Sequence, residues 1–76
     1  MTSLLTIGPG VSVRIVDIAG GEAVRRRLFS LGLHIGDRIE LTRRGILRGP
    51  VLIRHESTGV TLAIGRRIAH KIMVQA

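Results

Sequence analysis

Cysteine, tryptophan and tyrosine are missing from the chain, and Phe29 is its only aromatic residue. Without cysteine there are no disulfides and no thiolate metal sites, and a small domain of this kind is typical of a reducing compartment. The N-terminus lacks the basic leader and long apolar stretch of a secretory signal, and no segment approaches the roughly 18 uncharged residues of a membrane span. We therefore expect a cytoplasmic protein that does not span the membrane and has an aliphatic core.

Acidic residues are also scarce, since five Asp and Glu residues stand against twelve Lys and Arg and give a net charge of +7. The five acidic residues show no spacing typical of a general acid and base pair. The sequence also contains no G-x-S-x-G nucleophile motif and no glycine-rich phosphate motif. We therefore expect a protein that is not an enzyme. The positive charge favours an anionic partner, which could be nucleic acid, anionic lipid or an acidic protein surface.

Glycine is abundant, with 10 residues in 76, and it divides the chain into short segments typical of a small β domain. A chain of this length has room for one domain, residues 1–76. Alternating apolar residues and β-branched side chains predict strands at 11–18, 37–43, 51–55, 60–64 and 72–74. One α-helix is predicted at about 22–31 and a short helical turn at about 65–71. The fold class is therefore mainly β, a small closed or nearly closed barrel of about five to six short strands.

Five residues near the predicted helices are expected to have structural roles. Leu28 and Leu31 share a helical face with Val24 and should anchor the helix on the barrel. Gly32 suits a left-handed backbone at the end of the helix, and Gly36 suits a tight turn. Gly65, at the start of the predicted short helical turn, is the fifth residue expected to have a structural role.

The three histidines are the candidates for metal binding. His34, His55 and His70 carry imidazoles that suit late first-row metals, but their separations match no local metal-binding motif. The fold could bring a pair together, with Glu56 beside His55. No cofactor is firmly predicted, and Fe(II) or another divalent transition metal remains an alternative ligand.

The arginines fall into clusters along the sequence, and these clusters are the candidates for partner binding. Three consecutive helical residues spread over about 200° around the helix axis, so Arg25, Arg26 and Arg27 cannot all contact one flat surface. The near absence of aromatics counts against binding of single-stranded nucleic acid, which uses base stacking, and no helix-turn-helix pattern is present. The predicted contacts are Arg25, Arg26, Arg43, Arg44 and Arg48, with Leu47 as an apolar anchor.

The order of four segments carries information that composition does not. They are Gly20-Gly21 through Arg27-Leu28, then Leu31-Gly32-Leu33-His34-Ile35-Gly36-Asp37, then Gly49-Pro50-Val51, and finally Leu62-Ala63-Ile64-Gly65-Arg66-Arg67-Ile68-Ala69-His70-Lys71-Ile72-Met73-Val74. Together these segments span nearly the whole chain. They resemble the signature of the FeoA family of ferrous iron transport proteins, which combines a basic helix, L-G-L/M-x-x-G, G-x-P and L-G-R-x-x-A-x-x-I-x-V.

The resemblance implies an SH3-like barrel that acts as a cytoplasmic accessory protein in ferrous iron uptake. Its implied partner is FeoB, the membrane transporter with a cytosolic GTP-binding domain, and through FeoB it would be peripheral at the inner face of the membrane. A similar domain forms the C-terminal part of metal-dependent repressors of the diphtheria-toxin-repressor type, but this sequence contains no DNA-binding half. Arg67, which stands where many relatives carry a small residue, and the basic loop 44–49 depart from the family pattern.

Two alternatives of different classes stay open at this point. One is a small basic barrel that binds nucleic acid, and the other is a transition-metal-binding sensor module. Self-association into a homo-oligomer is compatible with all of these functions.

Overall fold

The computed structural model describes residues 1–43 and 49–76, so Arg44, Leu47 and Arg48 lie outside the described residues. In chain order, the elements are β1 (Thr2–Ser3), the 3-10 helix η1 (Leu4–Thr6), β2 (Ser12–Ile18), α1 (Glu22–Ser30), β3 (Arg38–Arg43), β4 (Val51–His55), β5 (Thr61–Ile64), α2 (Arg66–Lys71) and β6 (Ile72–Gln75). The predicted fold class, mainly β with one inserted helix and one short helix, is confirmed.

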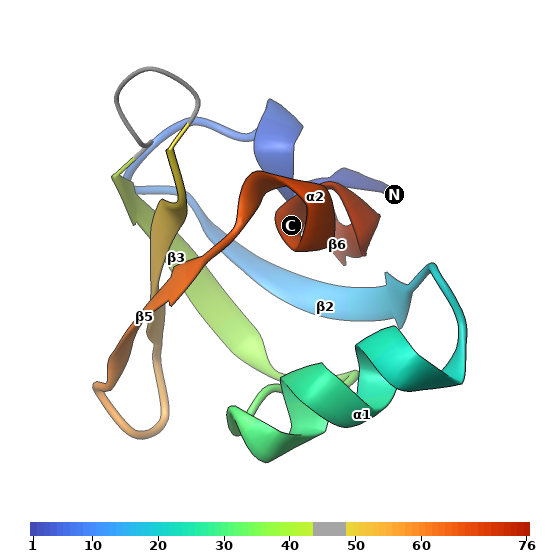
Figure 1. Ribbon diagram of the computed structural model, residues 1–76. Coiled ribbons are helices and arrows are strands. Elements are labelled where there is room, and N and C mark those ends of the chain that lie inside the picture. The colour runs from blue at the N-terminus through green and yellow to red at the C-terminus, as the bar shows by residue number, and fades with distance from the viewer. Residues whose placement is uncertain (44–48) are drawn as a thin grey trace.

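Within the described residues the strands form one antiparallel sheet in the order β1-β6-β2-β3-β4-β5. The sheet curls around a common interior, with β2 crossing the middle and β5 on the opposite flank from α1's N-terminal end (Figure 1). The register shifts between Ile15 and Asp17 on β2 and between Leu41 and Arg43 on β3. Such irregularities increase the local twist of a strand, which helps a short sheet to close into a barrel.

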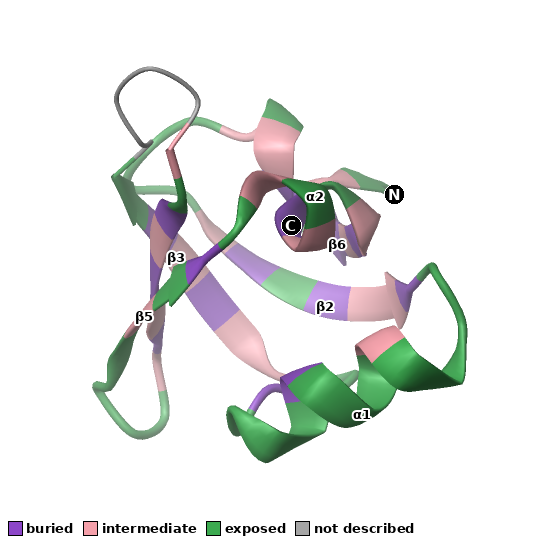
Figure 2. Cartoon of the chain, viewed as in Figure 1, coloured by how far each residue is buried: buried purple, intermediate pink, exposed green. Residues whose placement is uncertain are grey.

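The core lies inside the curled sheet and is aliphatic, as the sequence predicts. Alternate residues of β2, β3, β4 and β6 point inward, so buried positions recur along these strands (Figure 2). Leu4 from η1 and Ala69 from α2 complete the core and are fully buried. The other buried apolar residues are Val13, Ile15, Ile18, Leu28, Leu33, Ile39, Leu41, Val51, Ile53, Ile64, Ile72 and Val74.

The chain reverses direction at the end of α1 through a left-handed residue. Gly32 has φ +87°, and its N–H donates to the Phe29 carbonyl over 2.9 Å. The N–H of Leu33 donates to the Leu28 carbonyl over 2.9 Å, which completes a Schellman motif. Leu28 and Leu33 are both buried, and their contact across this turn is the apolar contact that usually accompanies the motif.

One predicted anchor of α1 is wrong. Leu28 is fully buried, but Leu31 is 42% exposed. The reason is that α1 ends at Ser30, so the helical spacing that groups Leu31 with Leu28 no longer applies at Leu31. The left-handed turn sends Leu33 into the core instead.

The sequence-based prediction also missed β1 and η1, which contributes the buried Leu4, and the other differences are small. The first long strand begins at Ser12, which leaves Val11 43% exposed, and β3 begins at Arg38 rather than Asp37. Gly36 has φ +99°, as a tight turn requires. Gly65 has φ −59°, and a Cβ added there would meet nothing within 4 Å, so the structure shows no steric need for glycine at this position.

We expect Gly32→Ala to destabilise the protein by about 1–2 kcal/mol, because alanine is strained at positive φ. An added Cβ at Gly32 meets nothing within 4 Å, so the loss would come from the backbone alone. Gly65→Ala is the matched control, since its φ suits alanine, and it should leave the free energy of unfolding unchanged or slightly higher. Urea unfolding followed by circular dichroism measures both variants. Equal stabilities for the two would contradict this account of the turn.

Candidate functional site

An open apolar pocket of about 250 Å³ lies between α1, the end of β2 and the loop after α1. Two of its lining side chains remain largely exposed, since Phe29 is 66% and Ile35 is 53% accessible. The ring of Phe29 meets the ring of His34 edge to face, with centroids 4.8 Å apart and planes at 83°. The pocket is lined by Ile18, Arg25, Phe29, Leu33, His34 and Ile35.

The turn at Gly32 explains why these apolar side chains stay at the surface. Leu28 and Leu33 take the interior positions on either side of the turn, and Phe29, Leu31 and Ile35 are left outside. Exposed apolar residues that gather around a pocket mark an interaction site more often than isolated ones do. This part of the molecule is therefore a candidate docking surface, hereafter the α1 pocket.

The predicted contact residue Arg25 is held at the rim of the α1 pocket. Its Nε donates to the carbonyl of Ile18 over 3.1 Å, and its Nη2 lies 3.5 Å from Oδ1 of Asp17. Both side chains of this ion pair are about half exposed, at 56% and 49%. The guanidinium is thus positioned at the rim and remains accessible to a second anion.

The structure separates the other predicted arginine contacts. Arg26 lies on α1 near the pocket, and its side chain is 80% exposed beside Glu22, with 3.9 Å between the charged atoms. Arg43 is exposed at the far end of β3, beside the segment 44–48 and away from α1 (Figure 1). Of these predicted contacts, Arg25 lines the α1 pocket, and Arg26 and Arg43 do not.

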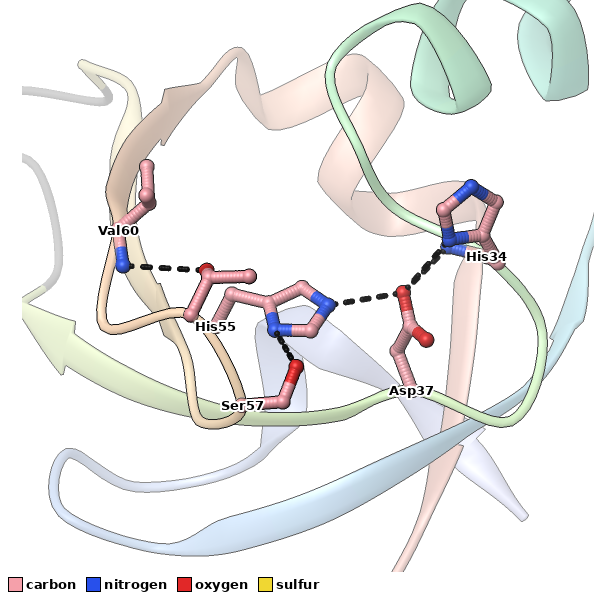
Figure 3. A network of polar contacts seen from close by, with 6 residues as sticks. His34, Asp37, His55, Ser57 and Val60 are labelled. Carbon is pink, nitrogen blue, oxygen red and sulfur yellow. Dashed lines mark hydrogen bonds and ion pairs between the residues drawn. The ribbon is translucent and has the colours of Figure 1, made fainter.

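A carboxylate behind the pocket fixes the loop that carries His34 (Figure 3). Oδ2 of Asp37 accepts from the backbone N–H of His34 over 2.8 Å and lies 3.1 Å from His34 Nδ1. The same oxygen lies 3.0 Å from Nε2 of His55, and Nδ1 of His55 lies 3.0 Å from Oγ of Ser57. A carboxylate only accepts hydrogen bonds, so both ring nitrogens that face Asp37 are assigned as N–H donors.

These contacts control the ionisation of Asp37. Burial acts to raise its pKa, but hydrogen bonds from the backbone of His34 and from the rings of His55 and His34 outweigh burial. They hold the pKa of Asp37 below its ordinary value of 3.8. Asp37 is therefore an anion throughout the physiological range, and it ties β3, the end of β4 and the loop after α1 together.

Two members of this network are recognisable from the sequence and two are not. His34 and His55 are candidates as imidazoles, and the structure brings them to one carboxylate. Asp37 and Ser57 carry no such signal, although Asp37 lies three residues after His34 and Ser57 two residues after His55. Such short spacings are the available signal, but they do not show which imidazole a carboxylate will contact across the barrel.

Of the four metal-site candidates, His34 and His55 meet at Asp37, whereas His70 and Glu56 are not part of that network. His70 lies exposed on α2, apart from the network, and Glu56 lies in the turn that follows the last residue of β4, His55. Within residues 1–43 and 49–76, no group of three or more His, Asp or Glu residues is placed to hold a metal ion. Only His34 of the network lines the α1 pocket, so Ser57, His55 and Asp37 do not face a bound molecule there.

We expect Asp37→Asn to lower the free energy of unfolding by about 1–3 kcal/mol at neutral pH, because hydrogen bonds to a charged acceptor are lost. The folded-state pKa of Asp37 is depressed, so its contribution is complete above pH 3.8 and is lost as the pH falls below that value. The variant should therefore lose less stability than the parent protein on acidification. Glu22→Gln, which breaks the exposed pair with Arg26, should change little at any pH. Urea titrations across the acid range measure all three proteins. Parallel pH profiles for the parent and Asp37→Asn would contradict the assignment.

In the part of the chain that the structure describes, no helix is long and apolar enough to cross a bilayer.

Comparison with known proteins gives one consistent result. The model of the FeoA domain matches residues 2–76. The Methanocaldococcus jannaschii protein named as an Fe(2+) transport protein A is 38% identical over 66 residues, which are 87% of this chain and 76% of that protein. The crystal structure of an iron uptake regulatory protein, FeoA, is similar with a TM-score of 0.85 and 35% identity, covering 97% of this chain and 93% of that one.

A manganese-dependent transcriptional repressor shares the fold alone. Its TM-score is 0.87 at 22% identity, and the match covers 96% of this chain and 35% of the repressor. The match over nearly the full chain, the identity to the Fe(2+) transport protein A and the shared barrel with its inserted helix agree with one another. The chain therefore belongs to the FeoA family.

Proposed function

We propose that this protein is a non-catalytic accessory component of ferrous iron transport and that it binds the cytosolic side of the FeoB transporter through the α1 pocket. Membership of the FeoA family supports the role in ferrous iron transport. The observation that carries the binding site is the open apolar pocket with Phe29 and Ile35 exposed beside Arg25. This arrangement suits a protein partner better than a small reactant, since it offers apolar area and a cation but no converging catalytic groups.

The shape and charge of the α1 pocket define what the partner must present. An apolar side chain of the partner would fill the pocket and cover Phe29 and Ile35, which gives the contact its affinity. A carboxylate beside that side chain would pair with Arg25. The guanidinium of Arg25 lies 3.5 Å from the carboxylate of Asp17, a long ion pair that the partner's carboxylate would replace. The remaining excess of positive charge would speed the encounter with an acidic surface more than it would strengthen the final complex.

The Asp37 network supports this role by holding one wall of the pocket in place. His34 is tied to Asp37 through both its backbone and its ring, and Asp37 is tied in turn to His55, which is only 8% exposed. A wall fixed before binding loses little conformational entropy when the partner arrives. The network is thus a positioning device for the docking surface.

The sequence segment 44–48 is proposed as part of a second contact. Arg43, the residue before this segment, is exposed at the end of β3 and carries no ion pair among the described residues. Contacts at both ends of β3 would let one partner surface span the barrel. This second contact rests on the positive charge of Arg43, Arg44 and Arg48 and on the apolar side chain of Leu47.

The experiment is a calorimetric titration of the purified cytosolic part of FeoB with this protein and its variants. We expect Phe29→Ala and Ile35→Ser each to weaken binding about tenfold or more, because each removes apolar area from the centre of the contact. Both residues are exposed, so the fold should survive the changes. Val60→Ser is the matched control, since Val60 is 51% exposed and lies outside the pocket.

The arginine contribution is tested by its dependence on salt. We expect Arg25→Glu to slow association and to flatten the salt dependence, because it removes a charge that steers the encounter. Arg14→Glu makes the same charge change at an exposed position of β2 outside the pocket, and it should slow association and flatten the salt dependence less than Arg25→Glu does.

Equal effects of Phe29→Ala and Val60→Ser, or no binding by the parent protein, would refute the proposed site. Retention on nucleic acid at low salt, lost at high salt, would favour the nucleic-acid alternative instead.

A further inference from the structure

The outer edge of β5 is an open strand edge with no charge on it. β5 is the last strand of the sheet, and it pairs only with β4 among the described residues. Residues 57–65 contain no Asp, Glu, Lys or Arg in a chain of net charge +7. Natural sheet edges are commonly protected by lysine, proline or a bulge, and β5 has none of these.

The strand register shows which backbone groups face the open side. The N–H of His55 donates to the carbonyl of Val60 over 2.9 Å. In an antiparallel pair the hydrogen-bonded positions alternate, so Leu62 and Ile64 also turn their backbone groups toward β4. Thr61 and Ala63 therefore turn their N–H and C=O groups outward.

The side chains leave this edge accessible. Thr61 and Ala63 are both exposed and small, and Leu62 between them is half-buried on the inner face of the sheet. The nearest cation across the sheet is Arg54, opposite Thr61, and it is neutralised by Glu40 at 2.6 Å. Another strand can thus approach Thr61 and Ala63 without meeting a bulky or charged side chain on β5 itself.

We propose that two copies of this chain associate by antiparallel pairing of their β5 strands, with Leu62 on the two-fold axis. In this register Thr61 lies opposite Ala63 of the partner subunit, and Ala63 lies opposite Thr61 of the partner subunit. Both are positions with outward backbone groups, so each pair exchanges N–H···O bonds in both directions. The two Leu62 side chains then form the closer, non-hydrogen-bonded pair at the centre.

A second copy fits this edge better than a charged partner does. The edge offers no charge to select an acidic segment, in contrast to Arg25 at the α1 pocket. Pairing with a second copy needs only outward backbone groups at alternate residues, which β5 has at Thr61 and Ala63. The two surfaces are distinct, because no residue of β5 lines the pocket. The dimer therefore does not depend on the proposed binding of FeoB.

The test is sedimentation velocity of the full chain from micromolar to millimolar concentration. We expect a monomer–dimer equilibrium that shifts toward dimer as salt increases, because two copies with charge +7 repel each other less when screened. Ala63→Pro removes one outward N–H without adding charge, at an edge position where proline is tolerated. Ala63→Lys places like charges near the axis. Both variants should raise the dissociation constant about tenfold or more.

Ala23→Lys is the matched control, since Ala23 is exposed on α1 and the added charge lies away from β5. Hydrogen exchange supplies an independent readout that also reports folding. The amides of Thr61 and Ala63 should become protected as concentration rises, and the amide of Leu62 should be protected at every concentration. A monomer throughout, or a dimer that Ala63→Pro and Ala63→Lys affect no more than Ala23→Lys does, would overturn the proposal.

Discussion

The left-handed turn at Gly32 decides which side chains around α1 enter the core and which remain at the surface. Because the chain reverses there, Leu28 and Leu33 meet inside the barrel and Phe29 stays outside. A second turn, with Gly36 at φ +99° and the N–H of Asp37 donating to the His34 carbonyl over 3.1 Å, places His34 next to Asp37. The core positions and the apolar wall of the pocket therefore depend on the left-handed conformation of Gly32, and the polar network behind it depends on that of Gly36, which glycine also adopts without strain.

The α1 pocket combines a rigid side with an exposed one. Asp37 fixes the loop through its hydrogen bonds to two histidines, and its depressed pKa shows that the folded structure stabilises the anion. Phe29 and Ile35 are only partly covered, so apolar area remains available at the rim. The aliphatic core, completed by Leu4 and Ala69, contains no aromatic side chain. The single aromatic residue, Phe29, therefore remains available at the surface.

Much of the fold could be predicted because it follows local patterns. Alternating apolar residues located β2 to β6 to within a residue or two but did not indicate the two-residue strand β1, and Gly32 marked the end of the helix region. Leu31 was assigned wrongly because helical spacing cannot tell where a helix stops. The network around Asp37 could not be predicted, since His34 and His55 are 21 positions apart and meet only through the pairing of β3 with β4. Of the described arginines, only Arg25 lines the pocket, and helical spacing alone could not single it out from its two neighbours.

The sequence by itself determined the aliphatic barrel, the absence of thiol chemistry, the excess of positive charge and the resemblance to the FeoA family. Those properties depend on composition and on short ordered motifs. The tertiary structure alone decided which residues form a site. Whether Leu31 or Leu33 is buried, which imidazoles share a carboxylate and which strand edge stays open all depend on contacts between distant segments. Local residue preferences do not fix such contacts, because they form only when the whole sheet closes.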